Sequence, residues 1–90
     1  MEEINKLRNQ IDIIDQMLVK QFCDRLKVCE KIGEIKKAND IPIEDLEREQ
    51  AVVDRLADFC SEVDYAYVKS LYKRIFTLCK ACEKEQSGKK

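Results

Sequence analysis

The sequence predicts an all-α fold with three helices per chain, of which the first is unusually long. The 90 residues include only 2 Gly and 1 Pro, too few for a turn-rich β-sandwich. Apolar residues recur alternately three and four positions apart, a spacing typical of a helix that buries one face. The apolar fraction of 44% is too high for a disordered chain. We therefore expect one helical domain over residues 1–90.

The first helix is expected from Ile4 to Lys37, with no Pro inside it. Such a helix is ~50 Å long at 1.5 Å per residue. A compact domain of this size has a radius of gyration near ~12 Å, so the helix must protrude with its apolar stripe uncovered. A second copy of the chain is the simplest cover, because two identical stripes can pack about a two-fold axis. The sequence thus predicts a homodimer.

Two shorter helices are expected after a break at residues 38–42, where Asn-Asp favours a turn and Pro42 disfavours helix at the residue before it. The second should begin near Glu44 or Asp45, with a seam running from Leu46 to Val63. The third should run from Tyr65 to about Glu85 with Asp64 as its N-cap, followed by a disordered tail at residues 86–90.

Composition argues against several classes of partner and site. Seventeen basic against 18 acidic residues give a net charge of −1, unlike a nucleic-acid arm or a polybasic membrane patch. No apolar run approaches the ~18 residues of a membrane span, so we expect a cytosolic protein. The five Cys include a Cys79-x-x-Cys82 pair, but without any His we interpret these thiols as core residues rather than metal ligands.

Charged residues occupy positions where the seam calls for apolar ones. Arg25 lies between Leu18 and Val28, Glu49 lies between Leu46 and Val53, and Glu83 flanks the third stripe. Buried charges are paired, change protonation, or line a cavity for a charged ligand. They could equally fix the register of a helical bundle.

Three more cations, Arg8, Lys36 and Arg48, flank the same stripes. Each taken singly is consistent with a solvated helix face. Together with Arg25 they give an excess of cations over acids, which favours a small, multiply anionic ligand between the helices.

The arrangement of these residues resembles that of the all-α chorismate mutases. The similarity lies in Leu7-Arg8-x-x-Ile11-Asp12-x-x-Asp15-x-x-Leu18, Asp24-Arg25, Ile32-Gly33-x-x-Lys36, Pro42-x-x-Asp45-x-x-Arg48-Glu49 and Tyr67-Val68-x-x-Leu71-x-x-x-Ile75-Phe76. It covers residues 4–86. The resemblance implies an intertwined six-helix homodimer with shared active sites that converts chorismate to prephenate, in phenylalanine and tyrosine biosynthesis. That rearrangement needs no nucleophile, metal or redox cofactor, which fits a chain without His.

The resemblance also implies a role for each charged residue. Arg25 would bind a substrate carboxylate, Lys36 would contact a carboxylate and the breaking ether oxygen, and Glu83 would face that oxygen. Arg8 would reach across from the partner chain to a carboxylate.

At the start of the second helix, Arg48 would order the pocket. Glu49 would accept a hydrogen bond from the ring hydroxyl, and the main-chain N–H of Asp45 would hold the same hydroxyl.

Two positions depart from the commoner pattern of the family. Cys79, a weak donor, stands where many relatives carry a small hydroxyl residue. Glu83 stands where many carry Gln. A carboxyl donates to the ether oxygen only while protonated; burial favours that form, whereas Lys36 and Arg25 favour the carboxylate.

Two other functions fit the same residues. An isochorismate pyruvate lyase on this scaffold would gather similar cations around a similar dianion. A non-catalytic helical dimerisation or regulatory module would use its seam charges for register alone.

Overall fold

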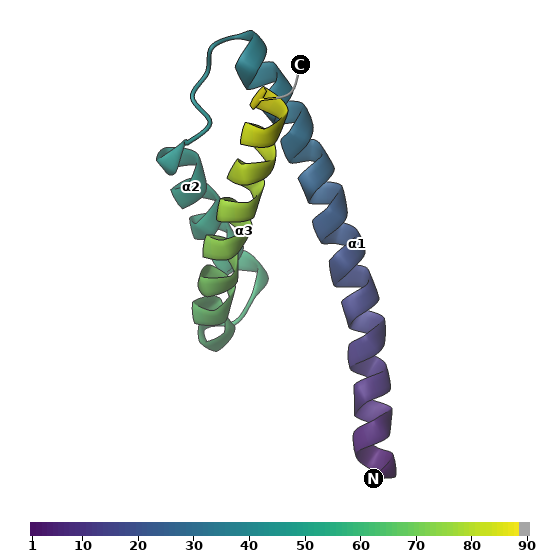
Figure 1. Ribbon diagram of the computed structural model, residues 1–90. Coiled ribbons are helices and arrows are strands. Elements are labelled where there is room, and N and C mark those ends of the chain that lie inside the picture. The colour runs from purple at the N-terminus through teal and green to yellow at the C-terminus, as the bar shows by residue number, and fades with distance from the viewer. Residues whose placement is uncertain (89–90) are drawn as a thin grey trace.

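The computed structural model describes residues 1–88, which form three α-helices and one short 3-10 helix. These are α1 (Glu2–Ala38), α2 (Leu46–Leu56), η1 (Ala57–Phe59) and α3 (Glu62–Gly88). Figure 1 shows α3 converging on the C-terminal part of α1, with α2 on the other side of α3. The predicted all-α fold with a long first helix is confirmed. In the described part of the chain, none of the helices combines the length and the hydropathy that crossing a bilayer requires.

The N-terminal half of α1 stands apart from the rest of the chain (Figure 1). The radius of gyration is 16.5 Å and the molecule extends over 55 × 30 × 15 Å. This exceeds the ~12 Å of a compact domain of this length. All of residues 1–21 are exposed. The extended shape is consistent with an intertwined dimer.

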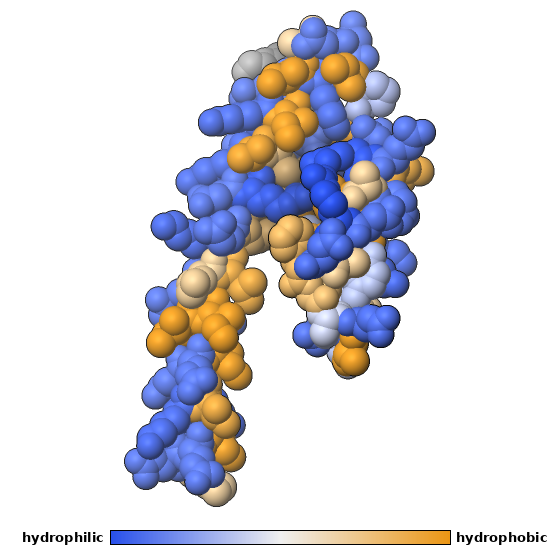
Figure 2. Space-filling model, turned by 180° about the vertical axis from the view of Figure 1, so that it is seen from behind, coloured by the Kyte–Doolittle hydropathy of each residue, from blue (hydrophilic) through white to orange (hydrophobic). Residues whose placement is uncertain are grey.

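An apolar stripe runs along this protruding arm, on one side of the helix (Figure 2). Its members share the three-four spacing of the predicted seam and keep 42% to 58% of their surface exposed. They are Ile4, Leu7, Ile11, Ile14 and Leu18. Helices of globular proteins usually bury such a stripe, so the arm presents an unusually exposed apolar surface.

The C-terminus of α1 closes in a Schellman motif. The N–H of Ile41 donates to the carbonyl of Lys36 at 2.8 Å, and the N–H of Asp40 donates to that of Lys37 at 3.4 Å. Asp40 has φ 52°, the left-handed conformation that this motif requires and that Asp tolerates. The turn reverses the chain, and the following residues lead to α2 beside the end of α1.

The second helix begins where expected, but its end and the start of the third helix differ from expectation. Asp45 caps α2, since its Oδ1 accepts from the N–H of Arg48 at 3.0 Å. The predicted seam continued to Val63, which is wrong, because α2 ends at Leu56 and Cys60 is extended. The N-cap prediction for α3 is also wrong: the Ser61 hydroxyl accepts from the N–H of Asp64 at 3.1 Å, so Ser61 is the cap.

A close contact between backbones joins α1 and α3 at Gly33. A Cβ at this position would lie 2.7 Å from both the Cα and the carbonyl oxygen of Glu83. Only a residue without a side chain allows the two backbones to approach so closely. The buried residues cluster here: Cys29 and Gly33 on α1, Cys79 and Glu83 on α3. α3 continues to Gly88, and residues 89 and 90 of the expected tail lie outside the described residues.

Candidate active site

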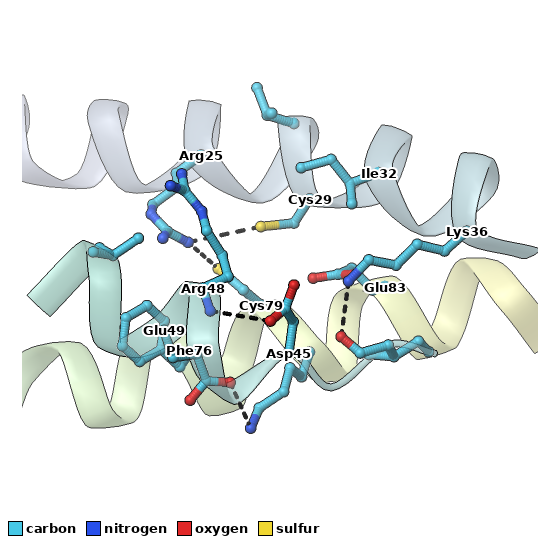
Figure 3. Close-up of a pocket in the computed structure, with 14 residues that line it drawn as sticks. Arg25, Cys29, Ile32, Lys36, Asp45, Arg48, Glu49, Phe76, Cys79 and Glu83 are labelled. Atoms are coloured by element: carbon cyan, nitrogen blue, oxygen red, sulfur yellow. Dashed lines mark hydrogen bonds and ion pairs between the residues drawn. The ribbon is translucent and has the colours of Figure 1, made fainter. Parts of the chain in front are cut away.

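A pocket of about 470 Å³ lies between α1, α3 and the start of α2 (Figure 3). Its lining is mixed, with apolar side chains around a group of charged ones. The charged members are Arg25, Lys36, Arg48 and Lys80, and Asp45, Glu49 and Glu83. Four cations against three carboxylates leave an excess of one positive charge, so the pocket favours an anion.

Arg25 enters the pocket from α1, where thiols and aromatic rings surround its guanidinium group. Its Nη1 donates to Cys79 Sγ at 2.6 Å and to Cys29 Sγ at 3.7 Å. Its guanidinium carbon lies 5.8 Å from the centroid of the Tyr72 ring and 6.0 Å from that of Phe76. Thiols and aromatic faces hold a guanidinium in place while leaving its charge available to an anion.

Cys29, one of the two thiols beside Arg25, is a neutral group. Burial is the main cause that raises the pKa of Cys29 to about 12, and the neighbouring Cys79 adds to it. The Arg25 cation acts in the opposite direction with a smaller effect. Cys29 therefore stays protonated at neutral pH and does not neutralise Arg25.

Lys36 and Glu83 meet at the opposite end of the pocket from Arg25 (Figure 3). Lys36 Nζ lies 2.8 Å from Glu83 Oε1 and donates to the carbonyl of Ile43 at 2.8 Å. The side chains are 18% and 9% exposed. The short contact to Glu83 is an ion pair without hydrogen-bond alignment, so within residues 1–88 the buried Oε1 has no donor. The lone pairs of such an oxygen remain available to accept a hydrogen bond from a ligand.

The start of α2 supplies the third side of the pocket. Asp45 lies at the N-cap, and Arg48 and Glu49 follow within the first turn. Glu49 is held from α3, because Lys80 Nζ lies 3.0 Å from Glu49 Oε2 and 3.0 Å from Glu44 Oε1. This side of the pocket therefore carries two carboxylates, Asp45 and Glu49, and two cations, Arg48 and Lys80.

The structure brings seven of the eight residues expected in the site into one pocket: Arg25, Lys36, Asp45, Arg48, Glu49, Cys79 and Glu83. Arg8 is the exception. It is exposed on the arm, roughly 25 Å along α1 from Arg25. The resemblance assigned Arg8 to the partner chain's site, and in a single chain it stays far from the pocket.

Two lining residues were missed by the sequence reasoning. Lys80 follows Phe76 by four positions and precedes Glu83 by three, so the helical period places it on the pocket face. Cys29 follows Arg25 by four positions in the same way. The period places both on the pocket face, but it does not distinguish Lys80 from an ordinary exposed lysine.

The Cys79-x-x-Cys82 pair is split between two environments. Cys79 Sγ faces Arg25, whereas Cys82 Sγ donates to the carbonyl of Leu26 at 3.7 Å and to Glu30 Oε1 at 3.8 Å. Over the described residues, no group of three or more potential ligands is placed to hold a metal ion.

Comparison with known proteins decides the family. The model of the family "Chorismate mutase type II" matches residues 7–84. The chain belongs to this family. The match includes every charged residue of the pocket and Arg8, so the chorismate mutase type II domain contains the whole candidate site.

Several curated proteins are similar to this domain. The bifunctional chorismate mutase/prephenate dehydratase of Aquifex aeolicus is 31% identical over 94% of this chain and 25% of its own length. The chorismate mutase of Methanocaldococcus jannaschii is 36% identical over 69% of this chain and 63% of its own length. The 3-dehydroquinate dehydratase of Pyrobaculum aerophilum is 32% identical over 86% of this chain and 23% of its own length. The chain thus spans between about a quarter and under two thirds of these relatives. No solved structure matches it significantly.

Proposed function

We propose that this domain converts chorismate to prephenate by an intramolecular rearrangement, in aromatic amino acid biosynthesis. Family membership supports the reaction, and the pocket supplies the chemistry. The observation that carries the proposal is the convergence of Arg25, Lys36 and Arg48 on one cavity. A dicarboxylate substrate fits that charge, and an enzyme accelerates a unimolecular rearrangement by holding the reactive conformer and stabilising the charge that develops.

Arg25 and Lys36 are the cations that we assign to the substrate carboxylates. The planar fork of Arg25 suits a bidentate pair with a carboxylate, and its thiol and aromatic neighbours leave its charge uncompensated. Lys36 is a compact cation beside the breaking C–O bond, where negative charge grows in the transition state. The ion pair between Lys36 and Glu83 must loosen when the substrate binds, because Glu83 and the substrate carboxylate compete for the same ammonium group.

Glu83 faces the ether oxygen in this proposal. It is 7% exposed, and its Oε1 has no aligned donor among the described residues. A protonated carboxyl in this place donates to the ether oxygen and stabilises the charge that forms there.

The start of α2 binds the substrate hydroxyl in this proposal. Glu49 accepts a hydrogen bond from it, and the N–H of Asp45 holds it from the helix terminus. Arg48 orders this side of the pocket, and Cys79 contributes mainly by holding Arg25.

We further propose an intertwined homodimer in which the arm of one chain completes the site of the other. The uncovered stripe on residues 4–18 supports this, because it has the length and spacing to pack on a second copy. Arg8 lies on the same arm and would reach the partner's pocket. The cytosolic location expected from the sequence remains a prediction.

The decisive experiment is a product analysis of the purified chain. We expect loss of chorismate absorbance, with a product that acid converts to phenylpyruvate. The same protein is also tested with isochorismate. Release of pyruvate from isochorismate, together with no prephenate from chorismate, would assign the lyase reaction instead. A stable dimer that neither reacts with chorismate nor binds a bicyclic transition-state mimic would indicate a non-catalytic module.

A further inference from the structure

Lys80 is a pocket residue to which neither the sequence pattern nor the proposed reaction assigns a role. Its ammonium group lies 3.0 Å from Glu44 Oε1 and 3.0 Å from Glu49 Oε2. The two carboxylates raise the pKa of Lys80, Glu49 more than Glu44. One side chain of α3 therefore joins the loop before α2, at Glu44, to the first turn of α2, at Glu49.

Two lysines from different helices hold that loop at consecutive residues. Lys36 of α1 donates to the carbonyl of Ile43, and Lys80 of α3 pairs with the side chain of Glu44. Each lysine also pairs with a pocket carboxylate, Lys36 with Glu83 and Lys80 with Glu49. Figure 3 shows Glu49, the partner of Lys80, on the side of the pocket away from Lys36.

The two lysines differ in what an anionic ligand does to them. A dianion placed between Arg25 and Lys36 competes directly with Glu83 for Lys36. The same dianion is repelled by Glu49, whose carboxylate also lines the pocket. The charge of Lys80 reduces that repulsion and leaves the Glu49 oxygens directed at a ligand hydroxyl.

We propose that Lys80 is a positioning residue, which holds Glu49 and the loop of residues 41–45 over the pocket while Lys36 exchanges Glu83 for the substrate. This rests on the proposed function. Lys80 acts through Glu49 and Glu44, both already bonded to it, and does not touch the substrate. It explains how one wall of the pocket keeps its shape when the ion pair of the other wall opens.

Steady-state kinetics of Lys80→Met provides the first test, because Met keeps the aliphatic stem and removes the charge. We expect KM for chorismate to rise about tenfold with a smaller change in kcat, since the hydrogen bond from the substrate hydroxyl to a misplaced Glu49 is weakened in ground and transition states alike. The increase should shrink as ionic strength is raised from ~0.01 to ~0.5 M. Lys80→Arg should stay within about twofold of wild type.

The matched control is Lys84→Met, one turn further along α3 at an exposed position. It makes the same change in net charge on the same helix. We expect its KM to equal that of wild type. An equal rise in both variants would mean that only overall charge matters and would overturn the role of Lys80.

The double variant Glu49→Gln/Lys80→Met separates positioning from direct binding. With Glu49 neutral, removing Lys80 should change KM by less than about twofold, because residues that act through one another are not additive. A full tenfold effect in the Glu49→Gln background would place Lys80 on the substrate and contradict the proposal.

Hydrogen exchange of the ligand-free protein tests the same contact without substrate. The N–H groups of Arg48 and Glu49 bond to Asp45, so loosening the loop should expose them. We expect Lys80→Met to speed their exchange severalfold, Lys80→Arg to restore it, and the amide of Tyr65 at the start of α3 to stay unchanged. An inactive wild-type chain would overturn the proposed function alone. An active chain in which Lys80→Met alters neither KM nor exchange would overturn the positioning role.

Discussion

The two halves of α1 share one apolar period but are used differently. Residues 22–38 pack on α3, and their seam includes Arg25, which points into the pocket. Residues 2–21 carry a more apolar seam, and every one of them is exposed within the described residues 1–88. The half with the charged seam is covered in part, since Cys29 and Gly33 are buried while Val28, Ile32 and Ile35 keep 40% to 59% of their surface exposed.

This difference shows what each type of seam residue is for. An uncovered apolar stripe marks a surface for a partner, because leaving it in water forgoes the hydrophobic stabilisation that burial gives. A charged seam residue such as Arg25, held by thiols and aromatic rings, marks a cavity for a ligand. Arg8 belongs to both kinds of region, since it is a charge on the unsatisfied arm.

Mixed dimers test this comparison with the largest expected effect. Arg8→Ala and Arg25→Ala should each lose roughly 10²- to 10³-fold in kcat/KM, since each removes a cation from the developing charge. Mixing the two chains restores one complete site per heterodimer. After random exchange about a quarter of the wild-type sites should work, and the measurement is activity before and after mixing.

The control for mixing is the pair Arg25→Ala and Lys36→Ala. Both residues lie in the pocket of the same chain, so their mixed dimer should contain no intact site. If chain exchange is shown by mass spectrometry and the Arg8 mixture stays inactive, the arm does not contribute to the partner's pocket.

A charge in the apolar stripe should break the arm's function without touching the pocket. Ile11 is 54% exposed in the single chain and lies at the middle of the stripe. Ile11→Asp would bury a carboxylate in the proposed interface, at a cost of several kcal/mol. We expect monomers by light scattering and a Tm lowered by about 10 °C or more. Asn9→Asp, on the other side of the helix, adds the same charge and should leave the dimer intact.

Much of the fold was predictable because the periodicity is nearly uninterrupted. The long first helix, the break at Asn39-Asp40 and the number of helices all follow from the spacing of apolar residues and from one Pro. The C-terminus of α2 and the N-terminus of α3 could not be predicted in this way, because the apolar seam continues in register through Cys60 and Val63. A local hydrogen bond sets this boundary. The Ser61 hydroxyl caps a new helix at a point where the apolar pattern indicated that the previous helix continued.

The site was predictable wherever a charge interrupted the seam. Arg25, Glu49 and Glu83 stood out for that reason, and all three line the pocket. Lys80 did not stand out, because an exposed-looking Lys on a helix is ordinary until its two acidic neighbours are known. Those neighbours, Glu44 and Glu49, are more than 30 positions away in the sequence, and only folding brings them together.

The pH dependence of activity tests the role of Glu83 in the part of α1 and α3 that forms the pocket. If a protonated Glu83 donates to the ether oxygen, activity should fall as the pH rises from about 5 to 8, by up to tenfold per unit. Glu83→Gln keeps a donor at every pH and should flatten the profile of kcat/KM. A flat wild-type profile would remove Glu83 from the ether-oxygen role.

The smallest expected effect concerns the contact between the two backbones at Gly33. Gly33→Ala gains about 1 kcal/mol of helix propensity but places a Cβ 2.7 Å from the Cα of Glu83. Backbone atoms cannot rotate aside as a side chain can, so α1 and α3 must separate. We expect a net loss of about 1–3 kcal/mol in the free energy of unfolding, measured by urea denaturation.

Lys31→Ala, at an exposed position on the same helix, is the control and should be close to neutral. Separation of the helices also draws Lys36 from Glu83, so kcat/KM of Gly33→Ala should fall together with its stability. A Gly33→Ala protein that is more stable than wild type would mean that the two helices lie further apart in solution. The pocket between them would then be wider, and its lysine and carboxylate would no longer meet.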